Sequence, residues 1–325
     1  MVGKKPVDSG AENRANKIKL RDLNLANDFN VEAAAKLIFR ECVHHLRLNL
    51  ARYCDHRDDI ALVQIRIGLR RTRVALKIFK TIIYPETYKK LKKEFRYFGR
   101  LLGDASDLDV FLKGMLNKTC PLNGLEATYE ELRSCIRLMR DQEQDQIHEA
   151  FTGERFQGLL QIFDDWIERD RSLNLGWADT DLSRRAIGPF AVGVISKGRK
   201  DLLARGSSIE ALSIDDLHNV RKYVKRSRYH LRFFSSLFDQ KTLSEGYHLL
   251  VQMQDCLGYV NDVREGLKLI SVLGGEVRAD HISNTLRLMA VIVAKASEDV
   301  ENHLETFAGL WRQYESYELT EANLL

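Results

Sequence analysis

Two twelve-residue stretches of this chain share one pattern. Residues 62–73 read LVQIRIGLRRTR, and residues 217–228 read LHNVRKYVKRSR. Aligned without a gap, the stretches differ in number by 155 (221 − 66), so that Arg66 falls on Arg221 and Arg70 on Lys225. Between the cations, apolar residues recur every three or four positions, which is the period of a helix with one buried face. Each stretch is therefore predicted to form a helix that carries a row of positive charge.

The correspondence continues beyond the two stretches. The same offset relates further identical residues: Phe79 and Phe234, Leu102-Gly103 and Leu257-Gly258, and Asp107 and Asp262. A gapless match of this length indicates an internal repeat. We expect an all-α protein of two pseudo-symmetric helical bundles, one over residues 31–171 and one over 181–315. The boundary is predicted within the polar segment 172–181, and residues 1–28 are expected to be a mobile polar tail.

Helical periodicity covers nearly all of the chain after residue 30. The expected helices are 31–54, 58–83, 86–102, 107–117, 122–149, 155–170, 181–204, 213–238, 241–257, 261–273 and 279–307, with a last helix near Trp311. Asp58 and Ser213 are predicted N-caps, and Pro85 suits the first turn of a helix. Gly103 and Gly258 are predicted to end their helices as C-cap residues.

Composition limits the class of protein. The 325 residues include 50 Lys and Arg against 46 Asp and Glu, so any basic surface must come from segregation of charge. Five scattered cysteines form no CxxC pair and suggest no disulfide framework. No signal peptide and no run of about 20 apolar residues is found, which favours a cytoplasmic location and no membrane partner.

Three rows of cations, which we call stripes, have the spacing i, i+4, i+7 and i+11. They are Arg66, Arg70, Arg73 and Lys77; Lys89, Lys93, Arg96 and Arg100; and Arg221, Lys225, Arg228 and Arg232. On a helix each stripe falls within roughly 60° and extends about 16 Å. Like charges at this spacing repel one another. A solvated face is the ordinary interpretation of one basic stripe, but a repeated stripe with few acids favours binding of a polyanion.

The residues beside the stripes suggest where they lie. The flanks of the first and third stripes of this set are largely apolar, so their helices are expected to be buried on most sides. The stripes would then line a basic groove or channel between the two helical halves, where a low dielectric strengthens their field. Arg is suited to this task because its guanidinium grips phosphate oxygens with two hydrogen bonds.

Taken together, these motifs resemble those of CHAD domains, the conserved histidine α-helical domains. The second half matches through His218, Arg221, Lys225, Arg226, Arg228, Tyr229, Gln254 to Gly258 and Asn261-Asp262. The first half matches through Arg66, Arg70, Arg71, Arg73, Phe79, Leu102-Gly103 and Asp107 to Val110. The resemblance covers roughly residues 31–315.

The resemblance implies two helical bundles that face each other across a basic channel. It also implies binding of inorganic polyphosphate and, as for some members, a location on polyphosphate granules. No triphosphate tunnel domain accompanies the chain, so a polyphosphate-metabolising enzyme would be a separate partner. The chain departs from the family pattern at Val63, where a histidine is expected, and at Ser106, where a basic residue is expected.

Several residues have alternative interpretations. His218 could contact phosphate, make a structural bond, or serve in phosphoryl transfer or metal binding. Its pKa should be low among so many cations. Arg71, Arg226, Asp107 and Asp262 are assigned as supporting residues, with the aspartates capping helices or orienting an Arg rather than binding metal. No catalytic motif is found, and no cofactor or metal is predicted. The leading hypothesis is non-catalytic polyphosphate binding; a nucleic-acid binder and a His218-dependent enzyme are the alternatives.

Overall fold

The computed structural model describes residues 18–19, 21–118, 123–168, 177–178, 180–206, 209, 212–274 and 282–325. These residues form helices and no named strand. The α-helices are α2 (Val31–His56), α3 (Asp59–Ile78), α4 (Pro85–Val110), α5 (Glu126–Thr152), α6 (Glu154–Glu168), α7 (Asp181–Arg184), α8 (Ile187–Leu203), α9 (Ile214–Phe233), α10 (Gln240–Gly274) and α11 (Ile282–Ser316). The all-α prediction is confirmed. None of these helices is both long and apolar enough to cross a membrane.

The ends of the helices follow the predicted capping residues only in part. The Asp58 carboxylate accepts a hydrogen bond from the Ile60 N–H (2.7 Å), and Ser213 forms a capping box with Asp216. Pro85 begins α4. Gly103 and Gly258, in contrast, lie inside α4 and α10, so the prediction that they end helices is wrong. A C-cap signal is local, whereas these helices are held on both sides of the glycine by packing.

The long helices continue further than the sequence suggested. Expected helices 86–102 and 107–117 are one element, α4, followed by a π-helical turn at Phe111–Leu116. Expected helices 241–257 and 261–273 merge into α10, and α11 continues past Trp311. In the opposite sense, expected helix 181–204 is divided into α7 and α8.

The chain divides into two compact units that differ from the two predicted halves. Unit 1 comprises residues 1–23, 32–99 and 148–180, and unit 2 comprises residues 24–31, 100–147 and 181–325. Residues 100–147, which the repeat assigned to the first half, are therefore part of unit 2. The predicted boundary segment 172–181 lies mostly outside the described residues.

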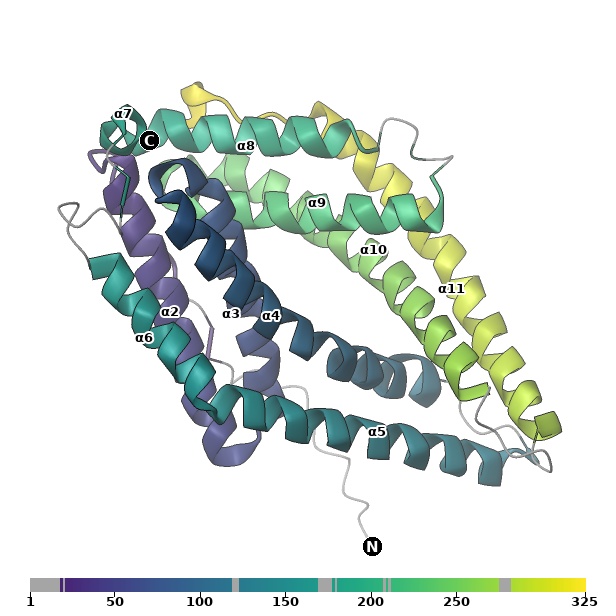
Figure 1. The fold of residues 1–325 in the computed structure, drawn as a ribbon. Coiled ribbons are helices and arrows are strands. Elements are labelled where there is room, and N and C mark those ends of the chain that lie inside the picture. The colour runs from purple at the N-terminus through teal and green to yellow at the C-terminus, as the bar shows by residue number, and fades with distance from the viewer. Residues whose placement is uncertain are drawn as a thin grey trace, which may run out of the picture. The chain divides into compact units, whose positions relative to one another are not determined.

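Unit 1 contains α2, α3, the first part of α4, and α6 (Figure 1), and its core is rich in aromatic side chains. Phe39 packs edge-on against Phe79, Phe163 and Trp166, and Trp166 stacks on Trp177. All five rings are nearly or fully buried. Large rings bury much apolar area each, so this cluster fixes α2 and α6 against α3.

Unit 2 is held by contacts between segments that are far apart in sequence. Leu108, Phe111 and Met115 form one buried cluster with Val263 of α10 and Leu288 of α11. Gly266 permits this approach, because a Cβ atom at that position would overlap Met115 and lie 3.1 Å from Phe111. The end of α4 is therefore packed on α10 and α11, which explains why residues 100–147 belong to unit 2.

The local structure repeats at the offset of 155 that the sequence indicated. α3 corresponds to α9 in both bounds, and the 3-10 turn Lys80–Ile82 corresponds to Ser235–Leu237. α4 and α10 begin at Pro85 and Gln240, which again differ by 155. Each turn is followed by an isolated antiparallel bridge, Ile83 with Trp177 and Phe238 with Leu324. The bounds of these elements repeat locally, while the duplication itself stays a prediction.

Two leucines within the predicted mobile tail, residues 1–28, are buried. They are Leu23 and Leu25, and the Leu25 N–H donates to the Ser236 hydroxyl (2.8 Å). Burial of two leucines fixes this segment, although polar residues surround them. Residues 1–17 of the predicted tail lie outside the described residues.

Candidate functional site

The first stripe lies along the outer side of α3. The opposite side of this helix is buried through Leu62, Ile65 and Leu69. Among the stripe residues, Arg66 and Arg70 are half-buried, whereas Arg73 and Lys77 are exposed. The amphipathic spacing therefore does what the sequence predicted for this helix: it buries one face and leaves the cations on the other.

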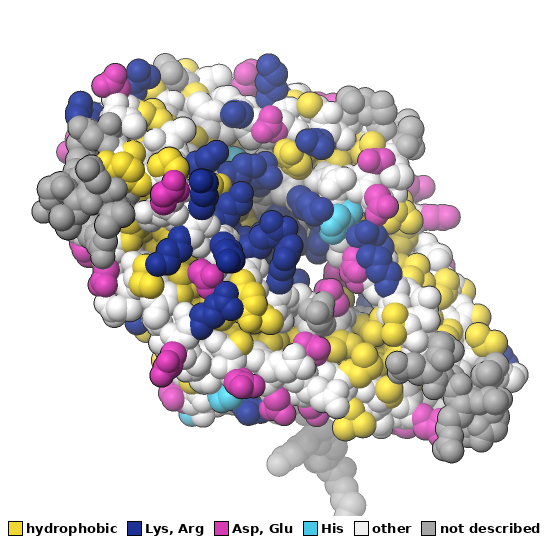
Figure 2. Space-filling model, viewed as in Figure 1, with side chains coloured by type: hydrophobic (Ala, Val, Ile, Leu, Met, Phe, Trp, Pro, Cys, Tyr) yellow, Lys and Arg dark blue, Asp and Glu magenta, His cyan; other side chains and the backbone are white. Residues whose placement is uncertain are grey.

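The second stripe lies on α4. Its four cations, Lys89, Lys93, Arg96 and Arg100, are all exposed, while Leu91, Phe95 and Phe98 are buried on the other face. The first three cations belong to unit 1 and Arg100 to unit 2. Figure 2 shows Lys and Arg side chains gathered over α3 and the first half of α4.

Within unit 1 the two stripes meet at Gly99. A Cβ atom at this position would lie 3.1 Å from the Arg73 Nη1 atom. The Arg73 guanidinium therefore rests against the backbone of α4 at Gly99, three residues after Arg96 and one residue before Arg100 of the second stripe. Glycine allows this close approach, which brings Arg73 of the first stripe against the helix that carries the second stripe.

The third stripe lies on α9 and is less exposed than the others. Arg221, Lys225, Arg228 and Arg232 are all half-buried. Val220, Val224 and Leu231 bury the remaining faces of the helix. Partial burial lowers the local dielectric and strengthens the field of these cations toward an anion. Arg221 also lies 3.7 Å from the Asp262 carboxylate of α10, which places Asp262 as an orienting partner.

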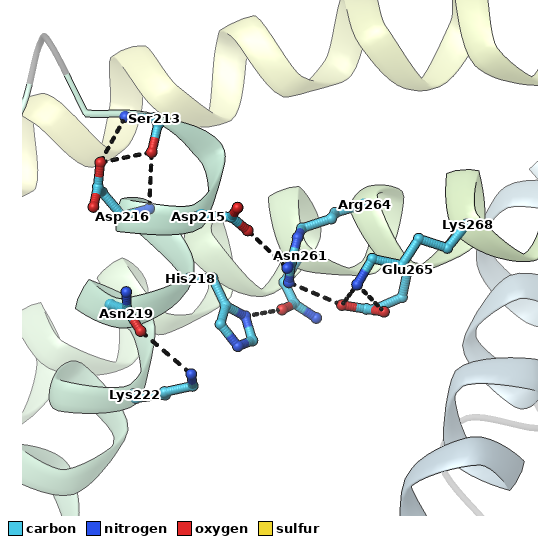
Figure 3. A network of polar contacts seen from close by, with 10 residues as sticks. All are labelled: Ser213, Asp215, Asp216, His218, Asn219, Lys222, Asn261, Arg264, Glu265 and Lys268. Atoms are coloured by element: carbon cyan, nitrogen blue, oxygen red, sulfur yellow. Dashed lines mark hydrogen bonds and ion pairs between the residues drawn. The ribbon is translucent and has the colours of Figure 1, made fainter.

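His218 stands one turn before Arg221 and is tied to α10. Its Nδ1–H donates to the Asn261 Oδ1 atom (2.6 Å), as Figure 3 shows. Burial lowers the pKa of His218, and the charges of Lys222, Arg264 and Arg221 lower it further, against the opposing effect of Asn261. The ring is therefore held in one tautomer, with Nε2 facing away from Asn261 as a hydrogen-bond acceptor.

Sequence reasoning missed the polar network that surrounds His218. Arg264 donates to Asp215 (2.8 Å) and to Glu265 (3.0 Å), and Lys268 pairs with Glu265 (3.1 Å), as drawn in Figure 3. Asn261, Arg264 and Lys268 follow one another at i, i+3 and i+7, so they share one face of α10. This spacing was the available signal, and Arg264 is tied to α9 through Asp215.

The residues assigned a supporting role are placed differently from one another. Arg71 is only 5% exposed and lies near His45 of α2. Burial, together with the charge of Arg71, lowers the pKa of His45 to about 4. Arg226 lies over the Tyr223 ring, 4.4 Å from its centroid. Asp107 is half-buried, and the nearby Asp109 accepts from Arg140 (2.6 Å). Arg71 is too deeply buried to contact a ligand directly, so any support that it gives to a site must act through its neighbours in unit 1.

Metal-ligating side chains do not cluster in the part of the chain that the structure describes: no three or more His, Cys, Asp and Glu side chains are placed to hold an ion. The stripes themselves consist of Arg and Lys side chains, which supply hydrogen-bond donors and positive charge. Such groups bind phosphate oxygens, and guanidinium groups do so with two bonds at once.

Comparison with known proteins identifies the fold and the family. The sequence pattern of the CHAD domain matches residues 37–270, which are 234 of the 325 residues. The chain belongs to the CHAD domain family. No curated protein sequence matches it.

Two solved structures share the fold of this CHAD domain. The crystal structure of the CHAD domain from the plant Ricinus communis aligns with a TM-score of 0.73 and 22% identity over 89% of this chain and 96% of that one. PptA from Streptomyces chartreusis aligns with a TM-score of 0.67 and 15% identity over 87% of this chain and 100% of that one. At these identities the likeness concerns the fold alone.

The two departures from the CHAD pattern have clear positions in the structure. Val63, at the place that corresponds to His218, is 51% exposed on α3. Ser106 is half-buried in α4. An exposed valine cannot donate a hydrogen bond, so this CHAD domain has a histidine beside the α9 stripe and none at the matching place on α3.

Proposed function

We propose that this CHAD domain binds inorganic polyphosphate, without catalysing a reaction, through the stripes of α3, α4 and α9. The observation that carries the proposal is the position of the stripes. Each occupies one side of a helix whose other side is buried, and each extends about 16 Å. A linear polyanion with closely spaced charges matches such a row, whereas a compact anion would contact only a part of it.

The properties of the cations support this choice of ligand. The α9 stripe is half-buried, so its cations act in a lower dielectric than cations on an open surface. The family adds a second support, because its members are polyphosphate binders. Nucleic acid is the competing ligand, but recognition of single strands relies on stacking aromatic rings, and the α3 stripe is flanked mainly by aliphatic residues.

The test is reversal of charge on α9. Arg221→Glu with Arg228→Glu changes the net charge from +4 to 0, since each reversal removes two charges. Each lost charge-assisted bond is worth about 1.5–3 kcal/mol, so affinity for fluorescent polyphosphate should fall roughly 100-fold or more. Circular dichroism should show unchanged helicity.

The matched control is Arg137→Glu with Arg287→Glu. Both residues are exposed and lie outside the stripes, Arg137 on α5 and Arg287 on α11. Their reversal gives the same net charge as the α9 variant. This control should bind polyphosphate nearly as well as the unaltered protein. The proposal fails if the α9 variant still binds, or if single-stranded RNA displaces polyphosphate at equal concentration of phosphate.

A further inference from the structure

Unit 2 contains a cavity of about 430 Å³ between α8, α9 and the segment at the end of α11. Ser227 and His230 contribute to it from α9. At 100° per residue, these two residues point roughly 130° and 170° away from the middle of the α9 stripe. The cavity therefore lies behind the stripe, and the cations proposed to bind polyphosphate do not line it.

Two polar side chains of the cavity, Arg199 and Tyr317, present buried hydrogen-bond donors. Arg199 donates through Nη2 to the backbone oxygen of Glu315 (2.7 Å), which fixes its guanidinium. Its Nε–H is buried and, within the described part of the chain, has no hydrogen-bond partner. The hydroxyl of Tyr317 is in the same situation. Lys200 lies exposed at the rim.

Both tyrosines of the cavity keep their protons at neutral pH. Burial raises the pKa of Tyr314 to about 12 and raises that of Tyr317 as well, and Arg199 opposes the shift in both. The Tyr317 hydroxyl, which has no hydrogen-bond partner within the described part of the chain, can therefore donate to an acceptor. Buried donors in native proteins normally have a partner, so unsatisfied donors in a cavity indicate space for a molecule that accepts.

The remaining walls of the cavity are apolar. Ile195, Leu203, Leu231 and Leu319 contribute aliphatic surface. Sites for small organic molecules usually have this character, with mostly apolar walls, a few convergent polar groups and a volume of roughly 300–1,000 Å³. The one carboxylate in the lining, Glu318, is exposed, so solvent screens its charge.

We propose that this cavity binds a small organic anion. Its carboxylate or phosphate group would accept from Arg199, and its apolar part would contact Leu203, Leu231 and Leu319. An inorganic polyphosphate chain does not match this cavity, because it has no apolar part to cover the aliphatic walls. The site is thus independent of the proposed function.

The test is titration calorimetry of the full chain with three probes: octanoate, phenyl phosphate and inorganic phosphate. We expect saturable binding of octanoate or phenyl phosphate at one site per chain, which also decides whether carboxylate or phosphate is preferred. Inorganic phosphate should bind at least ten times more weakly than the preferred organic probe, because it has no apolar part to contact the aliphatic walls.

Two variants locate the binding. Arg199→Met removes the cation and should lower the affinity of the cavity for the preferred probe at least tenfold. Ser196→Trp places a large ring at an exposed position of the lining and should block the cavity without disturbing the core. Arg287→Met, at an exposed position of α11, is the control and should have no effect. If Arg199→Met does not fold, Ser196→Trp decides the question alone.

The result that overturns the proposal is absence of saturable binding for both organic probes. Binding that survives Ser196→Trp, or survives a folded Arg199→Met variant, overturns it equally. Polyphosphate binding should be unchanged in the Ser196→Trp variant, so failure of this proposal can be distinguished from failure of the proposed function.

Discussion

At the scale of single residues, His218 has a hydrogen-bond arrangement that restricts what it can bind. Its Nδ1–H is used by Asn261, so the neutral ring presents only an acceptor at Nε2. The phosphate oxygens of a polyanion are also acceptors, and two acceptors cannot form a hydrogen bond with each other. Contact with phosphate therefore requires a proton on Nε2, yet burial lowers the pKa of this residue. Binding of polyphosphate should be accompanied by uptake of a proton.

Uptake of a proton on binding predicts a pH dependence with a definite sign. The folded, unliganded protein has a lowered His218 pKa and holds the ring neutral at pH 7.5; the bound polyanion raises that pKa. Affinity should therefore increase as pH falls from 7.5 to 5.5, by up to about tenfold per unit for one linked proton. His218→Gln keeps every other titrating group and should flatten the profile. Identical profiles for the two proteins, measured by fluorescence anisotropy, would contradict the prediction.

At the scale of elements, the packing of α8 against α9 depends on one glycine. A Cβ atom at Gly198 would lie 2.5 Å from the Nδ1 atom of the buried His230. An imidazole is rigid, so an alanine here must separate the two helices. Gly193, one and a half turns earlier on α8, has no atom within 4 Å of a Cβ position.

These two glycines provide a matched pair of substitutions. Gly198→Ala should lower the free energy of unfolding by about 1–3 kcal/mol through overpacking. Gly193→Ala should raise it by up to about 1 kcal/mol, because alanine has the higher helix propensity. Thermal unfolding followed by circular dichroism measures both. Equal stability of the two variants would mean that His230 yields without cost and that the contact is unimportant.

At the scale of the whole molecule, the placement of charge matters more than its sum. The chain carries 50 basic against 46 acidic residues, so its average surface attracts polyanions only weakly. Twelve of the basic residues form the three stripes. If polyphosphate binds there, its affinity should depend steeply on salt, as it does for nucleic acids that release counterions.

The slope of this salt dependence tests where the ligand lies. Arg228→Gln with Arg232→Gln lowers the net charge from +4 to +2 and removes two stripe cations. The slope of log affinity against log salt should become shallower by about 1.4–1.8, at roughly 0.7–0.9 per lost phosphate contact. Arg137→Gln with Arg287→Gln makes the same change in charge outside the stripes and should leave the slope unchanged. A shallower slope in both would assign the effect to net charge alone.

Local patterns in the sequence predicted several helices and the cations that they carry. The periodicity predicted α2, α3 and α9, the caps at Asp58 and Ser213 were correct, and the offset of 155 recurs in the bounds of α3 and α9. These features depend on residues within one or two turns of each other. A local pattern is therefore enough to predict them.

Other features depend on contacts that only the tertiary structure makes. Gly103 and Gly258 carry a local C-cap signal, but packing around α4 and α10 outweighs the roughly 1 kcal/mol that a glycine costs inside a helix. Residues 100–147 joined unit 2 because Phe111 and Met115 pack against α10 and α11, over 140 positions away. The burial of Arg71 and the cavity beside Arg199 likewise depend on neighbours from other helices. Burial is set by distant segments of the chain, and a short sequence window does not contain them.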